Sequence, residues 1–582
     1  MSTEKESENQ SNVTQRKRPS LLFINPFRSM GRPVRVPKPE ALGELKEEIK
    51  EHQRLYEISK KRLKGLRIVT PPPVDENIWE VVEPLTPIRW GYSYVRILRN
   101  RKTKEYFYEV IEPPLNPREK KILSFLYESF IDRVEIDREE DVVKSEEIIR
   151  EKMKEFLDEA QIKIEKISFE KIFYHLRNEL LGFGKIQILM DDKQLEDISC
   201  DGVNIPIYVF HRKYKNVRTN LRFTEEEDLD NFVLNLAQRS GKSISLANPI
   251  LDATLPDGSR LNATYGSEIT TRGSSFTIRK FREDPLTVVN LILFKTLSPE
   301  MAAHLWLAVQ YGDSIMISGG TASGKTTTMN AISHFIPPSS KVITIEDTRE
   351  IQLPHENWIA GLTRERKGDQ VGTSIDMYTL LVAALRQRPE YMIVGEVRGR
   401  ETMAVFQAMA TGQVCYATIH ADSVASIVHR LENPPINIPR ILILGLNLIV
   451  LQAQVRVRNR RTRRIKELTE IIGIEPVTNE IVSNVVYRWN PAKDDFRFSG
   501  HSRLYEKIMD IENMTTVEIL GEVKRRAEVL RWMAYKGYTD YRQVAQVVNE
   551  YYRDPEGLWS RMYKELPELR AKRPDLKYIE PG

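Results

Sequence analysis

Cysteine is almost absent from this sequence: Cys200 and Cys415 are the only two among 582 residues. Two isolated cysteines cannot build a four-cysteine zinc site, so that class of metal module is excluded. Each cysteine lies in a short apolar run typical of a strand. We therefore predict two buried free thiols.

Long apolar runs are also missing. No segment of about 18 apolar residues occurs, and residues 1–20 lack the apolar core of a secretory signal. The longest apolar segment, residues 438–450, contains a proline, an arginine and an asparagine, and we interpret it as a buried helix. These absences predict a cytosolic protein, and they leave open that it docks on the inner face of the cell membrane.

The net charge is small. A formal charge of +5 over 582 residues says little about nucleic acid, and 41% hydrophobic with 29% charged residues is an ordinary globular balance. The length suits several domains. Composition and pattern predict five parts. They are a disordered basic tail (1–40), a folded accessory domain (41–150), an α+β domain (151–290), a domain of alternating strands and helices (291–510) and a helical C-terminal extension (511–582).

Two basic segments interrupt this balance. Residues 16–38 combine arginines and lysines with apolar residues and prolines, which suits a solvated arm or contact with an anionic membrane. Residues 456–466 hold seven basic residues. They could contact nucleic-acid phosphates, but aromatic residues for base stacking are not interleaved. We favour a basic hairpin or partner-facing edge, and expect no specific nucleic acid.

Strand and helix patterns alternate between residues 314 and 419. Repeated βα units predict an α/β domain with a parallel sheet covered by helices on both faces. The strands are continuously apolar, as doubly covered strands are.

One loop in this domain has the pattern of a phosphate-binding loop, Gly-x-x-x-x-Gly-Lys-Thr. Glycines let backbone N–H groups turn toward a phosphate, and the following helix directs its positive end there. The lysine would reach the β- and γ-phosphates of ATP, and the Thr326 hydroxyl would bind Mg²⁺. The predicted ATP-binding residues are Gly319, Gly320, Thr321, Ala322, Ser323, Gly324, Lys325, Thr326 and Thr327.

Three further strands end in polar residues. Residues 391–394 lead to Glu396, which we expect to hold Mg²⁺ or its waters. Residues 343–345 lead to Glu346, our candidate for the residue that activates the attacking water. Residues 415–419 lead to His420, which would bond the γ-phosphate and sense its loss. Each also has a plainer interpretation as a polar residue at a strand end.

Together these motifs resemble the type II secretion and type IV pilus assembly ATPases, most of all their archaeal branch, which includes the archaellum motor. The family carries a P-loop, an aspartate box, a Walker B strand ending in Gly-Glu and a histidine box. The matching segments here are residues 319–326, 344–347, 393–398 and 411–420. The preceding domain is similar at residues 198–202, 251–260 and 277–281. The resemblance covers about residues 150–510.

The resemblance implies a RecA-like ATPase domain and a homo-hexameric ring in which two domains enclose ATP. Arginines of the N-terminal domain then act on the γ-phosphate, and Arg260 and Arg279 match those positions. A fixed guanidinium stabilises the charge of a transferring phosphoryl group. Each arginine also has a plain surface-charge interpretation, and Arg218, Arg222 and Arg239 are weaker candidates.

Three departures from the family pattern stand out. Pro389-Glu390 replaces the common Pro-Asp, the zinc module of bacterial members is missing, and both ends extend beyond two domains. We expect a motor that powers a pilus-like filament or pilin-like secretion with a polytopic membrane platform protein. The alternatives are the archaellum motor, a DNA-translocating ATPase, and a nucleotide-gated scaffold that barely hydrolyses ATP.

Overall fold

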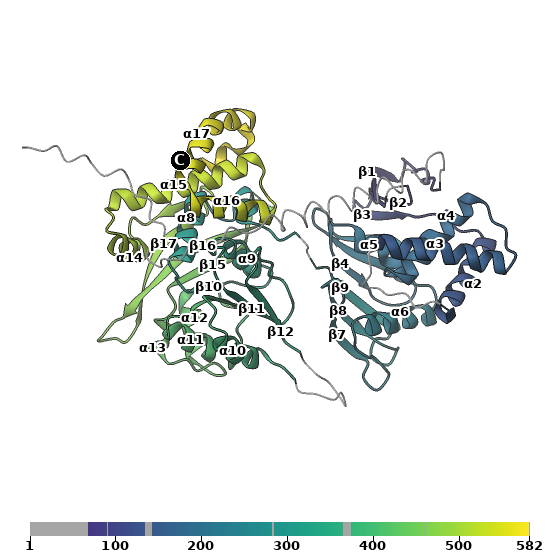
Figure 1. Ribbon diagram of the computed structural model, residues 1–582, viewed down its shortest axis with the longest axis horizontal. Helices are drawn as coiled ribbons and strands as arrows, with labels where there is room; N and C mark the ends of the chain where they lie inside the picture. Colours follow the sequence, from purple (N-terminus) through teal and green to yellow (C-terminus); the bar gives the residue numbers. More distant parts are fainter. Residues whose placement is uncertain are drawn as a thin grey trace, which may run out of the picture. The chain divides into compact units, whose positions relative to one another are not determined.

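The computed structural model describes residues 68–89, 91–133, 142–281, 284–364, 374–458 and 460–580 (Figure 1). The predicted basic tail lies outside these residues. The described chain forms two compact units, divided between residues 283 and 284.

The first unit is built on a nine-stranded sheet with the order β1-β2-β3-β6-β5-β4-β9-β8-β7. All neighbouring strands are antiparallel except β3 and β6, which share a short parallel ladder. The sheet therefore contains strands from both segments on either side of residue 150. Its strands are β1 (Trp79–Arg89), β2 (Ser93–Asn100), β3 (Tyr106–Ile111), β4 (Leu195–Cys200), β5 (Pro206–His211), β6 (Lys215–Arg222), β7 (Ile250–Thr254), β8 (Arg260–Thr264) and β9 (Ser275–Arg279).

Helices complete this unit. α6 (Glu226–Arg239) packs its buried residues into the core of the sheet, while α2 (Pro117–Arg133), α3 (Val142–Glu159) and α4 (Lys166–Leu180) share a core of their own. Residues 186–190 form an apolar run whose pattern also suits a strand, but they are helical. The segment forms η2 (Gly184–Ile186) and α5 (Gln187–Asp191). A short buried apolar run does not distinguish helix from strand by its pattern.

The second unit is built on another nine-stranded sheet, with the order β12-β11-β13-β14-β10-β15-β16-β17-β18 (Figure 1). The first six strands are mutually parallel, which confirms the predicted parallel sheet, and the last three are antiparallel. The strands are β10 (Ile315–Ser318), β11 (Val342–Glu346), β12 (Trp358–Leu362), β13 (Tyr391–Val394), β14 (Val414–Ile419), β15 (Leu448–Val457), β16 (Arg460–Ile474), β17 (Ile481–Asn490) and β18 (Asp495–Phe498).

The predicted buried helix at residues 438–450 was largely wrong. Only α13 (Arg440–Ile443) is helical, and β15 begins at Leu448. Gly445 packs closely against the helix α11 (Glu401–Ala410), and the Asn447 side chain accepts a hydrogen bond from the N–H of Ser314. The β-branched residues that follow then join the sheet beside β10.

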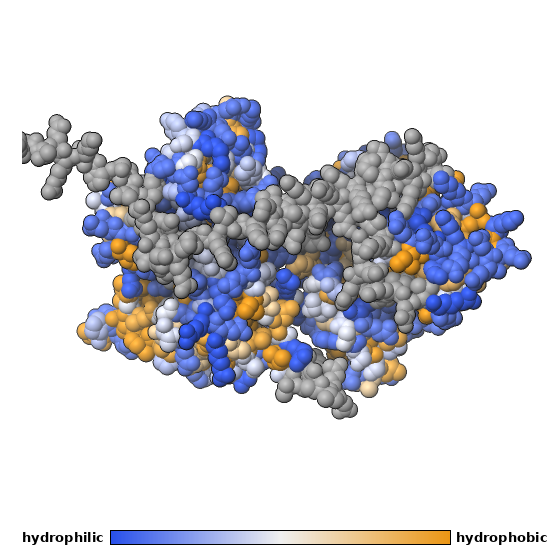
Figure 2. All heavy atoms as spheres, viewed as in Figure 1, coloured by the Kyte–Doolittle hydropathy of each residue, from blue (hydrophilic) through white to orange (hydrophobic). Residues whose placement is uncertain are grey.

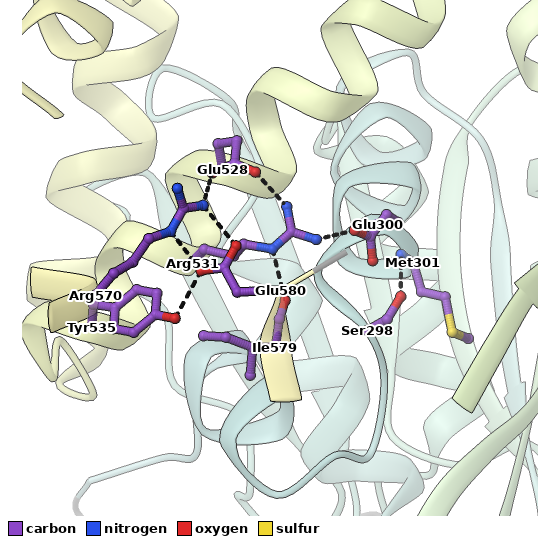
Figure 3. A network of polar contacts seen from close by, with 9 residues as sticks. All are labelled: Ser298, Glu300, Met301, Glu528, Arg531, Tyr535, Arg570, Ile579 and Glu580. Carbon is purple, nitrogen blue, oxygen red and sulfur yellow. Dashed lines mark hydrogen bonds and ion pairs between the residues drawn. The ribbon is translucent and has the colours of Figure 1, made fainter. Parts of the chain in front are cut away.

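The C-terminal extension is helical, as predicted. Its helices α14 (Arg503–Glu512), α15 (Thr516–Lys536), α16 (Tyr541–Arg553) and α17 (Pro555–Lys572) share one core with α8 (Pro299–Gln310) and the sheet. The Trp306 indole on α8 donates to the Tyr552 hydroxyl. Arg531 is 1% exposed and bonds Glu300, Glu528 and the carbonyl of Ile579, so α15 joins the start of the ATPase segment to the C-terminal end (Figure 3).

Both cysteines are buried free thiols, as predicted. In the described residues, no helix has the length and apolar character needed to cross a bilayer.

Candidate nucleotide site

Four parallel strands place the predicted site residues at one edge of the second sheet. The order β11-β13-β14-β10 brings together the carboxyl ends of these strands, where α/β sheets bind their ligands. Glu346 ends β11, Glu396 follows β13, His420 follows β14, and the phosphate loop follows β10. The strand patterns therefore predicted this edge correctly.

The loop is shaped by its glycines. A Cβ on Gly319 would lie 2.0 Å from the carbonyl oxygen of Gln452, so only glycine fits there. Gly324 has a φ of 95° and is the N-cap of α9 (Lys325–Ser333). Between them Ala322 has a φ of 58°, an uncommon left-handed conformation for alanine. Strand, glycine loop and helix thus have the arrangement that binds phosphates at a helix N-terminus.

The remaining loop residues differ in exposure. Gly320, Thr321 and Ala322 are exposed, whereas Ser323 is buried and its hydroxyl has no hydrogen-bond partner in the described chain. Thr326 and Thr327 are half-buried in the first turn of α9.

Lys325, His420 and Glu396 form one connected group. The Lys325 ammonium lies 3.4 Å from Nε2 of His420 and 3.3 Å from the carbonyl oxygen of Gly320. The same His420 Nε2 lies 3.4 Å from Oε1 of Glu396. The other carboxylate oxygen of Glu396 accepts a hydrogen bond from Arg398. A change at the phosphate loop can therefore reach Glu396 through a single imidazole.

Burial and neighbouring charges set the protonation of this group. Burial lowers the pKa of Lys325, and the charge of Glu396 opposes that shift. Burial, followed by the charge of Lys325, lowers the pKa of His420, so the imidazole is mostly neutral near pH 7. Burial acts to raise the pKa of Glu396, but the hydrogen bond and charge of Arg398 outweigh it and the net shift is downward. Glu396 is thus held as a carboxylate.

Glu346 has a different environment. Its side chain is buried, and Oε1 accepts hydrogen bonds from the N–H groups of Glu350 at 3.0 Å and Ile351 at 3.1 Å. Oε2 is buried and has no hydrogen-bond partner in the described chain. Burial raises the pKa of Glu346 to about 7, although the two N–H groups oppose it. A carboxylate with a free oxygen and a pKa near 7 suits a general base.

The residues at this edge fit Mg²⁺ that arrives with a nucleotide. No group of three or more His, Cys, Asp or Glu side chains that could hold a metal occurs in the described residues. Mg²⁺ is commonly held by one or two protein oxygens together with phosphates and water. The Thr326 hydroxyl and the Glu396 carboxylate supply such oxygens. Glu346 packs beside Gly395, the residue before Glu396, and its Oε2 has no partner in the described residues. When bound, the ion neutralises phosphate charge.

Arg260 and Arg279 belong to the first unit. They face each other directly across β8 and β9, so both side chains lie on one face of that sheet. Arg260 donates to Asp252 at 2.8 Å, and Arg279 lies 3.6 Å from Asp197. Both side chains are exposed. The structure thus pairs the two predicted arginines with each other, each beside a carboxylate.

Sequence reasoning missed several residues that contact the site, among them Arg398 and Gln452. Arg398 bonds Glu396. The sequence could have indicated this contact, because Arg398 follows Glu396 by two positions in the Gly-Glu-Val-Arg segment. Gln452 accepts a hydrogen bond from the Thr328 hydroxyl on α9 at 2.7 Å. No pattern in the sequence marked Gln452, because it lies 124 residues away from that partner.

A family model described as "Type II/IV secretion system protein" matches residues 182–546, more than half of the chain. The chain belongs to the type II/IV secretion ATPase family. It is an ATP-hydrolysing enzyme, as members of this family are, and the family binds ATP and forms hexamers. The RecA-like fold with its mostly parallel sheet agrees with this membership.

Relatives of the chain extend the comparison. An uncharacterised protein of Methanocaldococcus jannaschii is 40% identical over 396 residues, which is 67% of this chain and 71% of that protein. A probable conjugal transfer protein of Sinorhizobium fredii is 32% identical over 193 residues, 32% of this chain and 57% of its own. The VirB11 ATPase of the Brucella suis type IV secretion system, solved with sulphate, is 24% identical over 48% of this chain and 93% of its own, with a TM-score of 0.25.

The arrangement supports hydrolysis by positioning and charge. Loop N–H groups and Lys325 lie where they could bind phosphates, and Glu346 could take a proton from an attacking water on the oxygen that has no partner in the described residues. Neutral His420 in the tautomer that carries its proton on Nε2 could donate to a phosphate oxygen in place of Glu396 Oε1, which would couple the nucleotide to Glu396.

Proposed function

We propose that this chain is a hexameric motor ATPase that powers assembly of a type IV pilus-like filament, or pilin-like secretion, at the cytoplasmic face of the cell membrane. The supporting observation is the convergence of the phosphate loop, Glu346, Glu396 and His420 at one sheet edge in a chain of the secretion ATPase family. In this proposal Glu346, Glu396 and His420 are catalytic, and Mg²⁺ is bound by Thr326 and Glu396.

The proposal also assigns Arg260 and Arg279 to the γ-phosphate. Their support is their direct pairing across β8 and β9 and their exposure. The partner that receives the work is a polytopic membrane platform protein, and anionic lipid is a second contact. Archaellum rotation is the alternative function within the same family.

A genetic experiment tests the proposal. Deletion of the gene should remove surface filaments or secretion of pilin-like proteins, as seen by electron microscopy and analysis of secreted proteins. The wild-type gene should restore them, and Lys325→Ala should not, because it removes the cation that binds the phosphates. A normal filament and secretion phenotype in the deletion strain would contradict the proposed role.

The hexamer has its own test. Mass measurement of the full chain should show a sixfold assembly that is favoured by ATP. A monomer at all nucleotide concentrations would contradict the ring.

A second candidate is a DNA-translocating secretion ATPase. It is favoured by the relative described as a probable conjugal transfer protein and by exposed arginines on the β15–β16 hairpin. Single-stranded DNA should then bind in a salt-sensitive manner and stimulate hydrolysis. We rank this function second, because those arginines are not interleaved with aromatic residues.

A further inference from the structure

The β15–β16 hairpin continues past the edge of the sheet beside the phosphate loop. β15 runs parallel to β10, with Ser318 opposite Leu451, so the strand reaches the level of the loop at Gln452. It then extends to Val457 and pairs with β16 from Arg460 onward. The part of the hairpin beyond Gln452 therefore begins at the same level of the sheet as the phosphate loop.

The base of the hairpin packs against the loop and its helix. The Gln452 carbonyl oxygen lies 2.0 Å from the position that a Cβ on Gly319 would take. The side-chain amide nitrogen of Gln452 lies 3.1 Å from the corresponding Cβ position at Gly324. The Thr328 hydroxyl of α9 donates to its amide oxygen. The hairpin thus contacts both ends of the loop.

Arg463 contacts the middle of the loop. Its Nε donates a hydrogen bond to the carbonyl oxygen of Ala322 at 2.9 Å, and its Cδ lies 3.2 Å from the Cβ position of Gly324. Its neighbour Arg464 differs: it is buried and bonds both carboxylate oxygens of Asp494. Arg464 therefore stabilises the fold, whereas the exposed Arg463 interacts with the loop.

The contact orients one peptide of the loop. In a trans peptide the C=O of Ala322 and the N–H of Ser323 point in opposite directions. Arg463 holds the carbonyl on the hairpin side, and the Ser323 N–H points into the loop, where it donates a long hydrogen bond of 3.4 Å to the carbonyl oxygen of Gly320. A bound phosphate oxygen can replace that carbonyl as the acceptor. Inward N–H groups are what a phosphate-binding loop requires. The hydrogen bond also supports the left-handed conformation of Ala322.

We infer that Arg463 is a positioning residue for ATP binding, which holds the Ala322–Ser323 peptide in the orientation that presents an N–H to the phosphates. It acts through the loop backbone, and its cationic donor strengthens the hydrogen bond. This inference concerns ATP hydrolysis by this chain and does not depend on which filament or substrate the motor serves.

The same hairpin provides a matched control. Arg461 lies two positions before Arg463 on β16, is exposed as well, and faces Arg456 across the ladder. Within the described residues it makes no hydrogen bond with the loop. Arg461→Ala removes the same charge from the same strand and leaves the loop contact in place.

The test uses the full chain with magnesium and measures ATP affinity by fluorescent-nucleotide competition, together with KM and kcat. Arg463→Ala should raise Kd and KM for ATP about five- to tenfold, with kcat changed by less than about threefold, because one charge-assisted hydrogen bond is lost. Arg463→Lys should restore part of the affinity, and Arg461→Ala should behave as wild type.

Several outcomes would overturn the inference. They are an unchanged ATP affinity in Arg463→Ala, an equal loss in Arg461→Ala, or a fall confined to kcat. The unfolding temperature of each variant separates a loop effect from misfolding. If Arg463→Ala does not fold, Arg463→Lys and Arg463→Gln are compared instead, and the inference then requires that glutamine lowers ATP affinity more than lysine does.

Discussion

Glu346→Gln is the substitution that should separate chemistry from binding at this site. Glutamine keeps the shape and an oxygen that can accept the N–H groups of Glu350 and Ile351, but it cannot take a proton from water. Loss of a positioned general base lowers turnover by about 10²- to 10⁴-fold. We expect kcat to fall by that factor while fluorescent-nucleotide binding stays close to wild type.

The pH dependence follows from the environment of Glu346. Burial raises the pKa of its carboxyl to about 7, so the side chain is protonated below that pH and becomes a base as the pH rises. At pH 6 about one-tenth of the enzyme would carry the ionised form, and at pH 8 about nine-tenths. The value of kcat/KM should therefore rise roughly tenfold from pH 6 to pH 8. Magnesium is kept in excess, so that the nucleotide stays in its magnesium complex.

A neighbouring carboxylate supplies the control. Glu350 is exposed, its backbone N–H bonds Glu346, and its side-chain charge adds to the upward shift in the pKa of Glu346. Glu350→Gln should therefore keep near-normal turnover near pH 8, and its rise with pH should move to lower pH because that charge is removed. Wild-type turnover in Glu346→Gln, or the same tenfold rise with pH in its residual activity, would refute the assignment of Glu346 as the base.

Other substitutions test other parts of the molecule. Glu396→Gln should abolish turnover and keep nucleotide binding, and normal ATPase rates would remove Glu396 from the catalytic set. Arg531→Ala should destabilise the ATPase unit by about 1–3 kcal/mol, because it removes the donor to the Ile579 carbonyl and one of the two arginines that bond Glu528. Denaturant unfolding should show this, while Arg573→Ala, in an exposed pair, should change little. Changing Arg260 and Arg279 together to alanine should lower turnover at least about tenfold without lowering the unfolding temperature; wild-type turnover would exclude both.

Local pattern was enough to predict where most residues of the candidate site lie. The phosphate loop depends on glycines at fixed spacing and on a helix that follows, and these are properties of adjacent residues. Glu346, Glu396 and His420 could be placed together because parallel strands with crossover helices bring their carboxyl ends to one edge. The RecA-like ATPase domain and the family follow from the same segments.

Tertiary structure decided the features that depend on distant partners. Residues 438–450 are apolar enough for a buried helix or a strand. From Leu448 onward they form a strand, because they pair there with β10. The Glu346 oxygen that has no partner in the described residues lies on a buried side chain that packs beside Gly395, after a different strand. Arg463 lies 141 residues from Ala322, and in sequence it is one of seven similar basic residues. Charge alone could not distinguish it, because only the folded hairpin determines which of these arginines reaches the loop.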